Sequence, residues 1–143
     1  MSDFVFNRAK GAAAELCRNY TGALIMALYK AVGNVSTLRD ADNLSAVAAV
    51  AATTELTDGS YARKTGLTET VTLDDTNDRV DLDVPDQTWS ALAGSAVVGV
   101  VIAIESSASD SARIPLTQQD FAVTPDASDV TLQVNASGFY RAS

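Results

Sequence analysis

Residues 68–84 read TETVTLDDTNDRVDLDV, and this stretch decides the class of fold. Polar and apolar residues alternate in TETVTL and again in RVDLDV, which is the pattern of β-strands with two unlike faces. The DDTND between them is rich in turn-forming residues, so the two strands are predicted to form an antiparallel hairpin. Pro85 ends the second strand because proline has no backbone N–H to donate within a sheet.

Further strands are expected on the C-terminal side of this hairpin. The run VVGVVIAI at 97–104 is continuous and rich in β-branched residues, which predicts a central strand covered on both faces. Turn-rich sequences then separate three more predicted strands, at 112–121, at 130–134 and from 139 to the end.

On the N-terminal side, ALIMALYKA at 23–31 fits either a helix or a buried strand, and its shortness favours the strand. Alanine-rich segments flank it and favour helices. The first predicted helix follows an N-cap at Asp3 and runs through FVFNRAKGAAAELCRN. The second runs through LSAVAAVAATTEL at 44–56 and is capped by Asp42 or Asn43.

These elements predict a mainly β protein of the α+β class. We expect an antiparallel β-sandwich or barrel with one or two short helices in the N-terminal part. The length of 143 residues fits one domain, residues 1–143, with a helix-containing part at 1–60 and a β-rich part at 61–143.

Charge and the length of the apolar runs argue against two classes of partner. The formal net charge of −8 repels the phosphates of nucleic acids, so no nucleic-acid partner is expected. The pair Arg63 and Lys64 is interpreted as a solvated turn or strand end. The most apolar run, AGSAVVGVVIAI at 93–104, has 12 residues, whereas a membrane helix needs ~20, so no membrane partner is expected either.

Enzymatic chemistry is poorly supported, because the chain contains no histidine. Histidine is the commonest general base and the usual activator of serine and cysteine nucleophiles. Cys17, the single cysteine, is therefore interpreted as a small buried residue rather than a nucleophile. Asp81 and Asp83 could form a hydrolase pair, but their alternation favours a solvated strand face. We expect a protein that is not an enzyme and has no cofactor.

The hairpin turn holds the densest group of carboxylates. Oxygen ligands as close as those of Asp74, Asp75, Asn77 and Asp78 can hold Ca²⁺. The same residue types are selected by tight turns, because their side chains bond to their own backbone. The turn is the favoured interpretation, and a weak calcium site is the alternative.

Trp89 is the only tryptophan, and it lies in the segment DQTWSAL. It is expected to anchor the core. The alternative is a carbohydrate-binding module in which Trp89 and Tyr61 offer stacking platforms.

Several segments together resemble a family of small virion proteins of tailed bacteriophages. They are TVTLDDTNDRVDLDVPDQTWSAL at 70–92, the strand AVVGVVIAIESS followed by a disordered-looking ASDSA link, IPLTQQDF, and the ending DVTLQVNASGFYRAS. The resemblance implies a capsid decoration or minor capsid protein that binds the major capsid protein on the outer surface of the capsid. Such a subunit would be assembled in the host cytoplasm and be a homo-oligomer on the particle. A tail or neck subunit, such as a tube or connector protein, is the alternative.

Aromatic residues lie near both ends of the chain, where a free domain usually frays. They either dock on a neighbouring subunit or close the core of their own chain. The candidate interface residues are Phe4, Val5, Phe6, Phe139, Tyr140 and Arg141.

Overall fold

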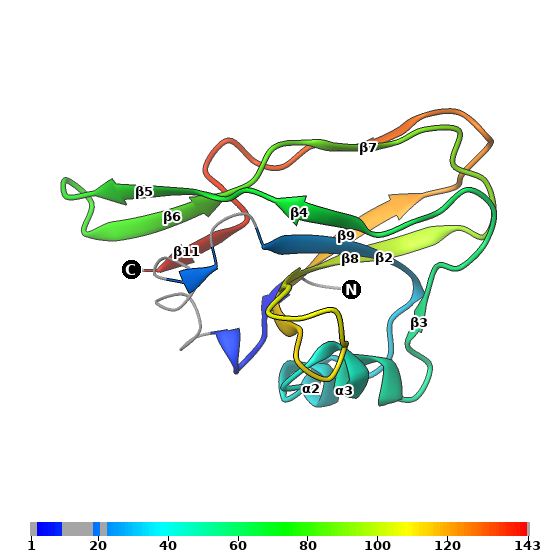
Figure 1. Ribbon diagram of the computed structural model, residues 1–143, viewed down its shortest axis with the longest axis horizontal. Coiled ribbons are helices and arrows are strands. Elements are labelled where there is room, and N and C mark those ends of the chain that lie inside the picture. The colour runs from blue at the N-terminus through cyan, green and yellow to red at the C-terminus, as the bar shows by residue number, and fades with distance from the viewer. Residues whose placement is uncertain (1–2, 10–18, 21–22, 143) are drawn as a thin grey trace.

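The computed structural model describes residues 3–9, 19–20 and 23–142 (Figure 1). Its largest element is a six-stranded antiparallel sheet in the order β1-β9-β8-β2-β3, in which β4 also pairs with β2. The strands of this sheet are β1 (Phe4–Val5), β2 (Leu24–Ala31), β3 (Thr54–Glu55), β4 (Lys64–Leu67), β8 (Val97–Ile104) and β9 (Ile114–Val123).

Within the described residues, two smaller antiparallel sheets and two short helices lie around the large sheet. In Figure 1 the helices lie below it, and β7 and its partner lie above. The third sheet has the order β11-β6-β5 and projects to one side, where the β5–β6 hairpin extends away from the rest of the molecule (Figure 1). These elements are α2 (Val35–Arg39), α3 (Leu44–Ala49), β7 (Gln87–Trp89), β10 (Val130–Leu132), β5 (Thr70–Asp74), β6 (Arg79–Asp83) and β11 (Tyr140–Ala142).

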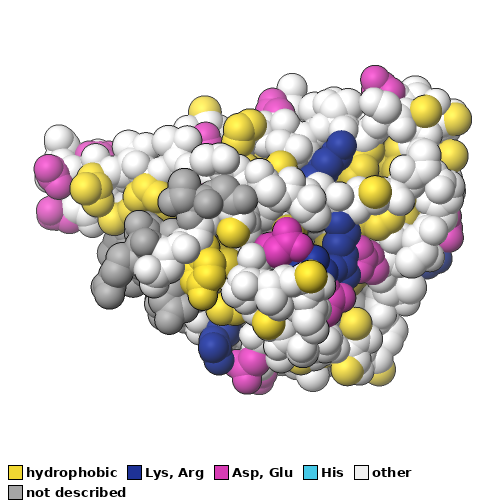
Figure 2. All heavy atoms as spheres, viewed as in Figure 1, with side chains coloured by type: hydrophobic (Ala, Val, Ile, Leu, Met, Phe, Trp, Pro, Cys, Tyr) yellow, Lys and Arg dark blue, Asp and Glu magenta, His cyan; other side chains and the backbone are white. Residues whose placement is uncertain are grey.

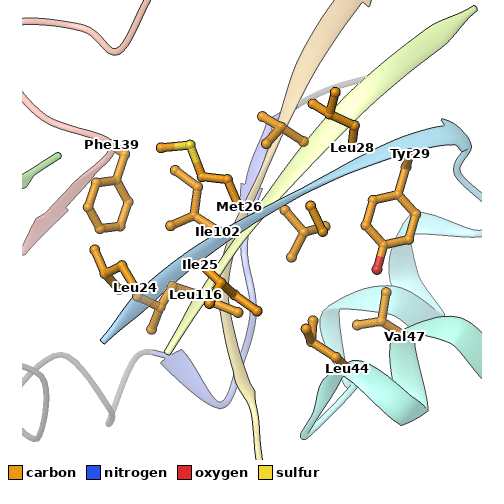
Figure 3. Packing of buried hydrophobic residues seen from close by; sticks show 14 of the residues in the cluster. Leu24, Ile25, Met26, Leu28, Tyr29, Leu44, Val47, Ile102, Leu116 and Phe139 are labelled. Atoms are coloured by element: carbon orange, nitrogen blue, oxygen red, sulfur yellow. The ribbon is translucent and has the colours of Figure 1, made fainter. Parts of the chain in front are cut away.

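The core lies on both faces of β2 and β8. These strands pair along their length, from Leu24 opposite Ile104 to Tyr29 opposite Gly99. Figure 3 shows Tyr29 beside Leu44 and Val47 of α3, and Met26 on the other side of the sheet toward Phe139. Because both faces are covered, β2 and β8 are apolar without alternation.

The predicted class of fold is confirmed: in the described part of the chain antiparallel β-sheets dominate, and helices α2 and α3 are short. The strand predicted at 23–31 and the central strand at 97–104 are both present. The hairpin is also present, with β5 and β6 in register from Thr70 opposite Asp83 to Asp74 opposite Arg79. The order of the large sheet runs from β1 to β3 without closing, so within the described residues it is an open sheet rather than a barrel.

The prediction of a helix N-cap at Asp3 is wrong. Phe4–Val5 forms strand β1 against β9, and the Asp3 carboxylate accepts a hydrogen bond from the backbone N–H of Asp120 at 2.6 Å. The exposed fraction of Phe4 is only 7%, so burial of its ring against the large sheet overrides the local preference for helix. Residues 10–18, which hold most of that predicted helix and Cys17, lie outside the described part of the chain.

The second predicted helix is present but shorter than expected. The Asn43 side chain caps it by accepting the N–H of Ala46 at 2.8 Å, which confirms one of the two predicted caps. The helix ends at Ala49, and Thr54–Glu55 becomes β3 because it pairs with the end of β2. An additional helix, α2, lies between β2 and α3 and is capped by Asn34.

Candidate interaction surface

The sheet formed by β5, β6 and β11, called here the hairpin sheet, has two unlike faces. Because side chains alternate along each strand, the register assigns every cross-strand row to one face. Thr72, Asp81 and Arg141 form a row on the polar face. The neighbouring rows belong to the apolar face: Leu73, Val80 and Ala142 in one, and Val71, Leu82 and Tyr140 in the other.

Ion pairs hold the polar face together. The Arg141 Nε lies 2.6 Å from Asp81 Oδ1, and the Arg79 Nε lies 3.2 Å from Asp81 Oδ2 and 3.1 Å from Asp74 Oδ2. The hydrogen bond from Arg141, aided by the charges of Arg141 and Arg79, lowers the pKa of the Asp81 carboxyl. The expectation that Asp81 lies on a freely solvated face is therefore wrong, since its side chain is 13% exposed and ion-paired.

The apolar face is buried at one end and open at the other. Leu82 and Tyr140 are buried against the body, at 1% and 9% exposure. Toward the turn, Val71 is 38% exposed and Leu73 is 71% exposed, and these are the exposed large apolar side chains among the described residues. Figure 2 shows apolar side chains along this projecting part. A shallow hollow of about 480 Å³ opens there, lined by Leu73, Asp75, Asp78, Arg79, Val80 and Ala142.

The turn of the hairpin contains the four residues proposed as a weak calcium site. The Asp74 carboxylate accepts hydrogen bonds from the backbone N–H of Asn77 at 3.2 Å and from its Nδ2 at 2.8 Å. The Asn77 side chain, with help from Arg79, lowers the pKa of Asp74. Asp78 has a φ of 50°, as a tight turn requires. Within the described residues, no group of three acidic or cysteine side chains is placed to hold a metal ion.

Both terminal segments contact β9, at the same part of the molecule. Gln119 of β9 donates from its Nε2 to the carbonyl of Phe139 at 3.3 Å. A hollow of about 230 Å³ is lined by both segments, through Phe4, Val5 and Phe139 among others. Four of the six candidate interface residues, Phe4, Phe6, Phe139 and Tyr140, are buried in the core of their own chain.

The other two candidate interface residues keep some access to solvent. Val5 is half-buried, and Arg141 is exposed on β11. The arrangement therefore joins the C-terminal candidates to the hairpin sheet, whereas the rings near both ends close the core.

A network of charged side chains that no sequence pattern indicates connects β3, the residue before β4 and the 105–113 loop. Arg63 donates to Glu55 at 2.7 and 2.6 Å and to Asp110 at 2.6 and 3.0 Å. Arg113 adds bonds to Asp110 at 2.7 Å and to Glu105. Basic and acidic side chains gather near the centre of the face in Figure 2. Arg63 and Asp110 are 47 positions apart, so no local pattern indicates the contact that joins the network.

This network corrects two expectations. Arg63 was expected to be solvated, but its side chain is 21% exposed, and the hydrogen bonds that it donates to Glu55 and Asp110 raise its pKa. The ASDSA link was expected to be disordered, but Asp110 anchors it, and the Arg63 hydrogen bond lowers the Asp110 pKa to about 2. The role of the network is structural, since each carboxylate accepts a hydrogen bond from a guanidinium group.

Trp89 anchors the core, as predicted. Its exposed fraction is 3%, its Nε1 donates to the carbonyl of Ala62 at 2.9 Å, and the Lys64 Nζ lies 5.5 Å from the ring centroid. Tyr61 donates its hydroxyl to Glu55 at 2.9 Å and accepts the Leu28 N–H at 3.0 Å. Burial raises the pKa of Tyr61. A pair of exposed stacking platforms is therefore not formed, which argues against the carbohydrate-binding alternative.

Comparisons with protein-family models, curated proteins and solved structures found no match to this chain. Among the described residues, no helix combines the length and the apolar character needed to cross a bilayer. The open end of the hairpin sheet, where Val71 and Leu73 are exposed, is the strongest candidate for a functional surface.

Proposed function

We propose that this chain is a non-enzymatic structural subunit of a tailed-phage virion, and that it works as a capsid decoration or minor capsid protein. The observation that carries the proposal is the hairpin sheet, which projects from the body and exposes Val71 and Leu73 at its end. A contiguous exposed apolar patch often marks a contact with another protein, and Val71 and Leu73 are neighbours on one face. The hairpin would dock its apolar face on the major capsid protein.

The rigidity of the projecting sheet supports this role. The Arg141–Asp81 and Arg79–Asp74 ion pairs fix the polar face, so the apolar face loses little conformational freedom on binding. Net charge is compatible with a place on the outer side of a shell, away from the packaged DNA. The proposal that the chain is part of a virion is supported by the resemblance of residues 70–92 and the C-terminal segments to small virion proteins.

Copy number in purified particles tests the proposal. Quantitative mass spectrometry of virions encoding this chain should find it in hundreds of copies per particle. Copies in multiples of six along the tail would instead support the tail or neck alternative. Absence of the chain from the particles would overturn both.

Docking through the hairpin sheet is tested by binding to shells that lack the chain. The purified protein should sediment with such shells, and Leu73→Asp should abolish this because it places a charge in the apolar contact. Ala108→Asp is the matched control, since Ala108 is exposed in the distant 105–113 loop and the variant gains the same charge. Equal binding by the two variants would exclude the apolar end as the contact.

A further inference from the structure

Among the described residues, no strand pairs with the outer edge of β5. In the hairpin sheet, β5 is paired on one side with β6 and is the last strand of the order. Its residues from Thr70 to Leu73 are exposed, and no described strand pairs with this edge. Such an edge offers a row of backbone donors and acceptors to another strand. Proteins usually protect long edges with lysine or proline, and β5, TVTLD, has neither.

We infer that β5 pairs antiparallel with β5 of a second copy, with a two-fold axis at Thr72. This register places Val71 opposite Leu73 of the second copy, and Leu73 opposite its Val71. It places Asp74 opposite Thr70, so no two like charges face each other. Apolar pairs opposite one another stabilise a sheet, and like charges opposite one another destabilise it.

Neighbouring registers do not have this match. In a two-fold antiparallel pair, residues opposite one another lie on the same face of the sheet. The two paired residue numbers must therefore add to an even number, so the axis moves by one whole residue between allowed registers. An axis at Val71 would place Leu73 opposite Glu69 of the second copy, and an axis at Leu73 would place Val71 opposite Asp75. Each of these sets an apolar residue against an acid. The Thr72 axis is therefore the self-complementary register of this edge.

The pairing would join two hairpin sheets into one sheet of six strands. It adds about four to six backbone hydrogen bonds, depending on which groups of β5 point outward. The pairing uses the backbone edge of β5 and leaves the apolar face of each hairpin sheet free. The exposed apolar ends of the two copies would then lie side by side. A single pair of five-residue strands buries far less than the ~1,200–2,000 Å² of a stable interface, so we expect a weak dimer. This inference stands apart from the proposed virion role.

Disulfide trapping tests the register. In a Cys17→Ser background, Thr72→Cys should form a disulfide-linked dimer under mild oxidation, because Cα atoms opposite one another are ~4.5–5.5 Å apart, within disulfide range. Thr70→Cys is the matched control, on the same strand and the same face. Position 70 lies two residues from the axis in each copy, so the sulfurs of two Thr70→Cys chains would be ~14 Å apart and should not form a disulfide. Equal yields from both variants, or none from Thr72→Cys, would overturn the inference.

Sedimentation velocity over a range of concentrations tests the pairing without a covalent bond. The wild-type protein should move toward the dimer as concentration rises, and Thr72→Lys should stay monomeric because two ammonium groups would meet at the axis. Within one chain this lysine would lie opposite Asp81, so the monomer keeps its fold, as circular dichroism should confirm. A wild-type protein that remains monomeric at millimolar concentration would refute the dimer. That result would leave the proposed presence of the chain in virions unaffected.

Discussion

Replacing Arg63 with methionine should lower the free energy of unfolding by about 2–3 kcal/mol. The change removes four hydrogen bonds and leaves Glu55 without a guanidinium partner, while Asp110 keeps Arg113. Breaking a fully buried ion pair costs about 3–5 kcal/mol, and exposed pairs contribute about 0–1 kcal/mol. Arg63 is 21% exposed, so its loss should fall between these limits.

Thermal and urea unfolding followed by circular dichroism measure this effect. With about 0.3 kcal/mol/K of unfolding entropy for a chain of this size, the melting temperature should fall by about 7–10 °C. Arg8→Met is the control, because Arg8 and Asp42 are 4.0 Å apart with side chains 53% and 70% exposed, and it should change stability by under about 0.5 kcal/mol. A loss from Arg63→Met no larger than from Arg8→Met would refute the view that this network fastens the loop to the sheet.

Three more outcomes are expected. Because the pKa of Asp110 in the folded state is about 2, its ionised carboxylate stabilises the fold fully above about pH 4, and this contribution should disappear as the pH falls from 4 to 2. Asp110→Asn should flatten the plot of unfolding free energy against pH in that window. Gly138→Ala should destabilise by about 3 kcal/mol in urea titrations, because a Cβ would meet the Leu82 carbonyl oxygen at 2.2 Å, whereas Gly66→Ala, with a similar positive φ and open space, should cost about 1 kcal/mol. Leu82→Ala should cost about 2–5 kcal/mol and Leu73→Ser under about 0.5 kcal/mol; equal melting temperatures for these two would contradict their burial.

The sequence identifies much of the hairpin sheet because its signals are local. Alternation in RVDLDV, the turn residues of DDTND and the stop at Pro85 act over a few residues, and the structure has β5, β6 and the turn where they indicate. Continuous apolar character likewise identifies β2 and β8, because a strand covered on both faces needs no polar positions. The Asn43 cap is local for the same reason.

The candidate surface could be predicted only in part. The alternation TVTL marks Val71 and Leu73 as one face of a strand, but a buried face and an exposed face look the same in sequence. Their exposure depends on how far the hairpin extends beyond the body, which the packing of Leu82 and Tyr140 decides. The pairing of β11 with β6 brings Arg141 to Asp81 over 60 positions, and no local pattern reports such a contact.

By itself, then, the sequence determined the strands, the hairpin turn and the helix cap, because each depends on residues within a few positions of one another. Tertiary structure alone decided that Phe4–Val5 is a strand, that Arg63 joins Glu55 to Asp110, and that β5 is an edge. These features depend on segments that meet only after the chain has folded, where burial of a ring or saturation of a carboxylate outweighs the local preference of a few residues.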